Sequence, residues 1–169
     1  MDVQARVDLL LATPKAMAGT PKWVTTDREG QRRWLRTLTI SGESTGLDLI
    51  IDNWPASPLQ RVTVTLNYGR CISRLDAWEH DRHNNHEVRN KITPSDIELG
   101  WIFGPHGHLW AHNRHLGTPT SLPVDLEFAI KLPANVQGFE NSFRWFCGQT
   151  NINCSADELP TLPQREYLI

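Results

Sequence analysis

The strictest constraint on the fold of this chain is the alternation of apolar and polar residues over positions 61–68. In the run Arg61-Val62-Thr63-Val64-Thr65-Leu66-Asn67-Tyr68, every second residue is apolar, and several side chains are β-branched. A period of two is typical of a strand that buries one face only. Gly69-Arg70 then forms a tight turn into a further strand at 71–76. These two segments therefore predict neighbouring strands of one sheet.

The rest of the chain adds a few short elements around this pair of strands. Apolar spacing predicts helices at 1–12 and 137–149 and strands at 32–40, 47–51 and 107–111. Polar, proline or glycine residues predict a connector at 13–26, a hairpin turn at 41–46, a break at 53–58, a long loop at 77–100 and an extended C-terminal tail, while 128–132 is ambiguous. We therefore expect a single domain over 1–169. Its predicted fold is α+β: a four- to five-stranded, mostly antiparallel sheet with flanking N- and C-terminal helices.

Composition excludes several classes of protein. The chain has 17 Lys and Arg against 19 Asp and Glu, so a globally basic nucleic-acid coat is not expected. No apolar run approaches the roughly 20 residues of a membrane span, and no membrane partner is expected. Its first residues carry no export signal, and its three cysteines cannot all pair within the chain. We therefore expect a cytoplasmic location with free thiols.

The histidines are concentrated in one part of the chain. All seven lie between His80 and His115, a window of 36 of the 169 residues. Imidazole titrates near neutral pH, transfers protons and binds metals, so this window is where we expect chemistry. The window opens with His80-x-x-His83-x-x-His86. It continues with His106-Gly107-His108, whose two rings project from the same face if the segment is a strand.

Arg74-Leu75-Asp76 places a cation and a carboxylate two residues apart on a predicted strand. Both side chains can therefore lie on the same face. Asp76 could orient a histidine ring or bind a metal, and Arg74 could hold a phosphate. The alternative is an ordinary ion pair that contributes little to stability.

These residues support two chemical interpretations. Three histidines, or two with Asp76 or Glu79, could bind a divalent metal ion. Without a metal, one histidine could act as general base and another as general acid in RNA cleavage, and Arg74 or Arg114 could stabilise charge on the phosphoryl oxygens. The structural alternative is that the histidines are solvated loop residues or hydrogen-bonding groups. The candidate catalytic residues are Arg74, Asp76, His80, His83, His106 and His108.

The seven tryptophans also allow two interpretations. Trp34, Trp110 and Trp145 fit core positions, whereas Trp78 and Trp101 lie at the two ends of the histidine-rich loop. Core packing or anchoring of the loop is one interpretation. Stacking on RNA bases is the other.

The motifs that carry these residues resemble a known group of proteins. Arg74-Leu75-Asp76, then His80 or His83, then Pro105-His106-Gly107-His108 is similar to a pattern in small bacterial proteins, one branch of which is the TumE-like toxins of toxin–antitoxin pairs. A related branch also has H-x-N after the aspartate, like His83-Asn84-Asn85, and a helix that leads to an Asn-Ile pair, like 143–152. The resemblance implies an α+β fold and, for the toxin branch, RNA cleavage.

Three functions are therefore considered. The first is a histidine-dependent nuclease, an RNA-cleaving enzyme of toxin type, whose expected partners are RNA and a cognate protein. The second is a non-catalytic interaction protein, either antitoxin-like or a phage-encoded inhibitor that binds a nucleoprotein complex. The third is a metal-binding protein without turnover. No organic cofactor is expected, and a divalent metal at the histidine cluster is the one candidate ligand of this kind.

Overall fold

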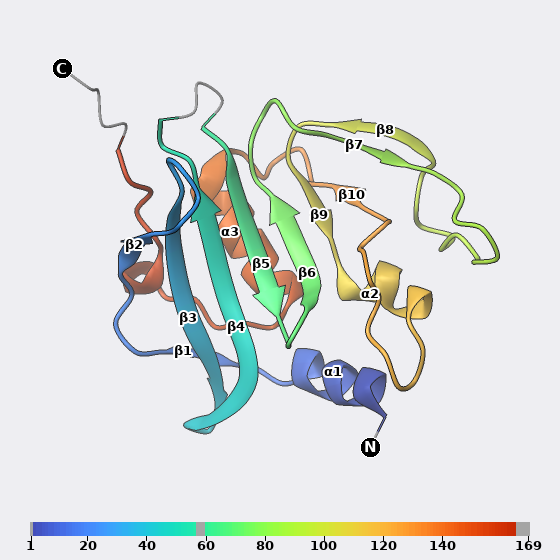
Figure 1. Ribbon diagram of the computed structural model, residues 1–169, viewed down its shortest axis with the longest axis horizontal. Coiled ribbons are helices and arrows are strands. Elements are labelled where there is room, and N and C mark those ends of the chain that lie inside the picture. Colours follow the sequence, from blue (N-terminus) through green and yellow to red (C-terminus); the bar gives the residue numbers. More distant parts are fainter. Residues whose placement is uncertain (1, 57–59, 165–169) are drawn as a thin grey trace.

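The computed structural model describes residues 2–56 and 60–164 (Figure 1). Its helices are α1 (Val3–Ala12), α2 (Trp110–Asn113) and α3 (Gly138–Gln149), with short 3-10 turns η1 (Arg114–Leu116) and η2 (Ala156–Glu158). Its strands are β1 (Ala16–Ala18), β2 (Trp23–Thr25), β3 (Arg32–Ile40), β4 (Glu43–Asn53), β5 (Val62–Asn67), β6 (Cys71–Asp76), β7 (Arg82–Asn85), β8 (Gly100–Phe103), β9 (His106–His108) and β10 (Ile130–Lys131).

An eight-stranded antiparallel sheet forms most of the molecule. Its strand order is β1-β3-β4-β5-β6-β9-β10, and β2 also pairs with β3. The predicted α+β class, with a mostly antiparallel sheet and a helix near each end of the chain, is confirmed. The predicted number of four to five strands is too low. The additional strands β1, β2 and β10 are two or three residues long, too short to show a periodic pattern.

The sheet buries the face that carries alternate apolar residues of the long strands. Leu47, Leu49 and Ile51 of β4 are fully buried, as are Val64 and Leu66 of β5. Helix α3 crosses behind the central strands (Figure 1). Its Phe143 ring meets Trp34 of β3 edge-on, with ring centroids 6.3 Å apart. The main core therefore lies between α3 and this face of the sheet.

A bulge in β6 decides which residues reach the opposite face. Leu66 pairs with Ser73, but Asn67 pairs with Cys71, so β6 holds one extra residue and both Ile72 and Ser73 are buried. After the bulge, Leu75 pairs with Val64 of the core face. Arg74 and Asp76 therefore project from the other face.

The long loop expected at 77–100 contains regular structure. Strands β7 and β8 pair within and just beyond it as a separate two-stranded antiparallel sheet, with His83 opposite Ile102. Figure 1 shows this two-stranded sheet beside the end of the main sheet that carries β9 and β10. β7 has no apolar residue, so its sequence carries no hydrophobic alternation and resembles a loop. The prediction of an irregular loop is therefore wrong over 82–85.

Other boundaries also differ from expectation. The strand expected at 107–111 ends at His108, and helix α2 begins at Trp110. The ambiguous segment 128–132 contains β10. The expected break at 53–58 includes residues 57 and 58, and the expected tail includes 165–169; these positions lie outside the described residues. Among the described residues, no helix has both the length and the apolar character that crossing a membrane requires.

Candidate functional site

Strands β6 and β9 bring the two sequence motifs together. Their antiparallel register pairs Arg74 with His108 and Asp76 with His106. All four side chains lie on the sheet face away from α3, because the intervening pair of Leu75 and Gly107 faces the core. Gly107 leaves room for Trp145 of α3, because a Cβ atom at position 107 would lie 2.6 Å from the far edge of that ring.

Arg74 and Asp76 organise the centre of this cluster. The guanidinium Nε of Arg74 donates to Asp76 Oδ2 at 2.7 Å, and Nη2 lies 2.8 Å from His108 Nε2. The same Asp76 oxygen lies 3.5 Å from the Nε2 atoms of both His106 and His108. One carboxylate oxygen therefore faces two imidazoles and a cation.

Strand β7 supplies the third imidazole. The ring centroid of His83 lies 4.6 Å from that of His108 and 5.7 Å from that of His106, and the latter two rings are 5.2 Å apart. Imidazoles from two separate stretches of sequence thus meet in one cluster, together with Arg74 and Asp76. His80 is not part of it: its side chain is exposed and lines a separate cavity described below.

The hydrogen bonds of the outer ring nitrogens fix the tautomers of the three histidines. A carbonyl oxygen can only accept, so each ring nitrogen bonded to a carbonyl must carry the proton. The three pairs are His83 Nε2 with Glu127 O at 2.8 Å, His106 Nδ1 with Gly104 O at 2.9 Å, and His108 Nδ1 with Leu126 O at 2.7 Å. In the neutral rings, the lone pairs therefore lie on His83 Nδ1, His106 Nε2 and His108 Nε2.

Residues 126–129 form the scaffold that holds two of these rings. The first two carbonyls of this segment accept from His108 and His83. The backbone of the next two residues is bonded by buried asparagine side chains, Phe128 by Asn113 and Ala129 by Asn85. Four successive residues are thus paired with side chains instead of a neighbouring strand.

Burial controls the charge of the cluster. Burial lowers the pKa of His108 to about 4, and it also lowers the pKa of His83. Burial alone would raise the pKa of Asp76, but the hydrogen bond and positive charge of Arg74 outweigh it and lower that pKa. At neutral pH, His108 is therefore a neutral ligand or proton acceptor, and Asp76 is ionised.

Two overlapping groups of side chains have the geometry of a metal site. The ligand atoms of His83, His106 and His108 lie within 4.8 Å of one another, and so do those of Asp76, Asp81 and His106. Two aspects of the cluster suit a transition metal: the neutral imidazoles, and the outer N–H groups that donate to backbone carbonyls. The sequence analysis did not identify Asp81 as a candidate metal ligand, and its only distinguishing feature there is its place within the histidine window. Glu79, which the sequence suggested as a ligand, lies in the adjacent cavity.

The remaining histidines lie outside the three-histidine cluster. His112 Nε2 lies 2.8 Å from Asp96 Oδ2, and the ring of His115 stacks on Phe128 at 5.8 Å. His86 is exposed. Structural roles, the alternative considered for the histidines, therefore apply to His112 and His115.

Arg114, the other candidate for phosphate binding, is engaged at α1. Its Nη2 pairs with Asp8 at 2.8 Å, and the indole N–H of Trp110 donates to the same aspartate.

Trp34 and Trp110 are buried as predicted. Trp145 is partly buried against the core, whereas Trp101 on β8 is 57% exposed.

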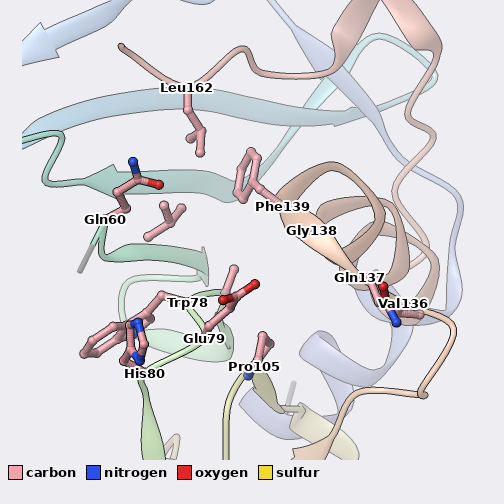
Figure 2. Close-up of a pocket in the computed structure, with 12 residues that line it drawn as sticks. Gln60, Trp78, Glu79, His80, Pro105, Val136, Gln137, Gly138, Phe139 and Leu162 are labelled. Carbon is pink, nitrogen blue, oxygen red and sulfur yellow. The ribbon is translucent and has the colours of Figure 1, made fainter. Parts of the chain in front are cut away.

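A cavity of about 490 Å³ lies next to the cluster (Figure 2). Its wall includes Ala77–His80, which directly follow Asp76, and Pro105, which directly precedes His106. The three-histidine cluster itself is more enclosed, because His106 and His108 are at most 1% exposed.

Comparison with protein-family models, with curated proteins and with solved structures finds no match to this chain, so the site alone indicates its function.

Proposed function

We propose that the protein is a metal-dependent hydrolase of phosphodiester bonds that acts on RNA, with its metal centre at His83, His106 and His108. The observation that supports this most strongly is the tautomer pattern. Each ring uses its outer nitrogen to donate to a backbone carbonyl, so the lone pair of each neutral ring lies on its other nitrogen, and the three rings offer ligand nitrogens within 4.8 Å of one another. Lone pairs that face one another beside an ionised carboxylate repel; Arg74 offsets this repulsion at Asp76 and His108, and a bound ion would offset it at all three rings by taking the place of Arg74 on His108 Nε2.

Burial favours a metal centre over a metal-free pair of acid and base. The side chains of His106 and His108 are 2% and 0% exposed, so a phosphodiester cannot contact both rings. A single ion can reach them, because its bonds to imidazole nitrogen are about 2 Å long. Of the metal-free and metal-dependent interpretations, the second therefore fits this enclosure better.

The open side of the cluster suggests where the substrate lies. The side chain of Arg74 is 37% exposed, and that of Asp76 is 6% exposed. Arg74 can therefore contact a phosphoryl oxygen from the solvent side while Asp76 fixes its orientation. A bound divalent ion would supply the Lewis acidity that polarises the phosphodiester.

Metal binding and RNA cleavage can be tested in sequence. Protein purified without a histidine tag is stripped with chelator and titrated with Zn²⁺ or Mn²⁺ by calorimetry and thermal shift. We expect one ion per chain and no binding by the double variant His106→Ala, His108→Ala. His86→Ala is the matched control, because His86 is exposed and outside the cluster. Failure of the stripped wild type to bind either ion would overturn the metal centre.

Cleavage of single-stranded RNA then tests the reaction. We expect activity from the metal-loaded wild type and from His86→Ala, with loss of activity after chelation and in the double variant. Equal cleavage by the double variant would show contamination. A bound ion without cleavage would overturn the hydrolase and leave a metal-binding protein without turnover.

The non-catalytic alternative has one observation in its favour. Trp101 and Phe103 on β8 are 57% and 65% exposed and stack on each other with ring centroids 6.2 Å apart. Exposed stacked aromatics are typical of contact surfaces. A stoichiometric partner whose binding is lost in Trp101→Ala but retained in the double histidine variant would support this alternative.

A further inference from the structure

We propose that the cavity beside the cluster binds a nucleobase whose edge offers two adjacent N–H donors, as guanine does. As a subsite for an RNA base it rests on the proposed function, but its binding chemistry is independent of the metal. The cavity, of about 490 Å³, is lined by Ala77–His80, by Pro105 and by residues at the start of α3. Since Asp76 and His106 adjoin these lining residues in sequence, a base held here would lie next to the cluster.

The walls of the cavity suit a flat ring. Figure 2 shows Trp78 and His80 on one side of the cavity and Phe139 with Leu162 across from them. The Arg61 guanidinium lies 5.8 Å from the ring centroid of Trp78. Unstacked RNA bases are recognised by stacking on aromatic side chains of this kind.

The polar groups of the cavity select the edge of the ring. Glu79 is exposed within the cavity, and its carboxylate has no hydrogen-bond or ion-pair partner in the described part of the chain. The indole N–H of Trp78 is buried and also lacks a partner among residues 2–56 and 60–164. A carboxylate accepts two parallel N–H donors, which the ring N–H and the exocyclic amine of guanine supply side by side.

Charge excludes the phosphate from the same cavity. Among the described residues that line the cavity, Glu79 is the one with a permanent charge, and none is a Lys or Arg. An anion there would meet the Glu79 carboxylate, because the Arg61 guanidinium stacks on Trp78 and does not line the cavity. The phosphate of a bound nucleotide therefore lies outside the cavity, and the nearest cation of the cluster is Arg74.

The test uses guanosine 5′-monophosphate and adenosine 5′-monophosphate as probes with chelator-treated protein. Binding is followed by calorimetry and by tryptophan fluorescence. We expect the guanosine nucleotide to bind at least tenfold more tightly than the adenosine nucleotide. Glu79→Gln should weaken guanosine binding about tenfold, because it removes one of the two acceptor oxygens. Glu87→Gln, on the same segment but outside the cavity, is the matched control.

Further variants keep the inference separate from the proposed function. Trp78→Phe should retain binding but lose most of the fluorescence change, and the double variant His106→Ala, His108→Ala should bind the nucleotide as the wild type does. Nucleotide binding without RNA cleavage would leave the base site standing and overturn the hydrolase. Equal affinity for both nucleotides, no binding, or an unchanged affinity in Glu79→Gln would overturn the base site, even if RNA is cleaved.

Discussion

Asn85 gives the sharpest test of the scaffold that holds the candidate site. Its amide donates to the carbonyls of Glu98 and Ala129 and accepts from the amide of Ala129, each at 2.9 Å, and it is 1% exposed. Asn85→Ala removes three hydrogen bonds, each with a net contribution of about 1 kcal/mol. It also leaves both backbone groups of buried Ala129 unpaired. We therefore expect a loss of about 3–4 kcal/mol in the free energy of unfolding.

Urea denaturation measures this loss directly, and Asn84→Ala is the matched control. Asn84 is the exposed neighbour on the same strand, so its replacement should change the free energy of unfolding by less than about 0.5 kcal/mol. Asn85→Asp should be at least as harmful as Asn85→Ala at neutral pH, because a carboxylate would then face two carbonyl oxygens. A loss below about 1 kcal/mol for Asn85→Ala would refute the role assigned to residues 126–129.

Two further predictions concern positions away from this scaffold. Gly107→Ala should lower the free energy of unfolding by about 1–3 kcal/mol, because the new methyl group would overlap the ring of Trp145. The same substitution should cost less when Trp145 is replaced by Leu. An equal loss in both backgrounds would contradict this cause. Burial lowers the pKa of Lys15 to about 8 from 10.5. The folded state therefore loses this proton first, and the free energy of unfolding should rise by up to about 3 kcal/mol as the pH rises from 8 to 10.5. Lys15→Met should lack this rise in urea denaturation at pH 7.5 and 10, and the same rise in both proteins would contradict the assignment.

The periodic part of the fold could be predicted because its strands bury one face only. Strand β5 alternates over its whole length, so its pairing with β6 and the shared face of Arg74 and Asp76 follow from a period of two. The same reasoning places His106 and His108 on one face. The bulge at the start of β6 is not visible in the sequence, but it lies before Arg74 and leaves that alternation intact.

The part that could not be predicted depends on polar strands and side-chain pairing. Strand β7 faces the cluster with His83 and the scaffold with Asn85, so its inward positions are polar. A hydrophobic pattern cannot reveal such a strand, since no apolar face is buried. The role of residues 126–129 could not be predicted either. Their backbone is bonded by asparagine and histidine side chains, so it leaves no strand-pairing pattern in the sequence.

The scaffold also explains how a polar cluster can persist inside the protein. Buried imidazoles lose their hydration, and the loss is offset only if every polar atom finds a partner. The outer nitrogens of His83 and His108 find theirs in residues 126–129, which Asn85 and Asn113 in turn hold in place. Of the inner nitrogens, that of His108 accepts from Arg74, and within residues 2–56 and 60–164 no side-chain donor is bonded to the other two. The fold thus satisfies the outer side of each ring and leaves His83 and His106 able to offer a lone pair, which is the arrangement expected if a cation completes the proposed centre.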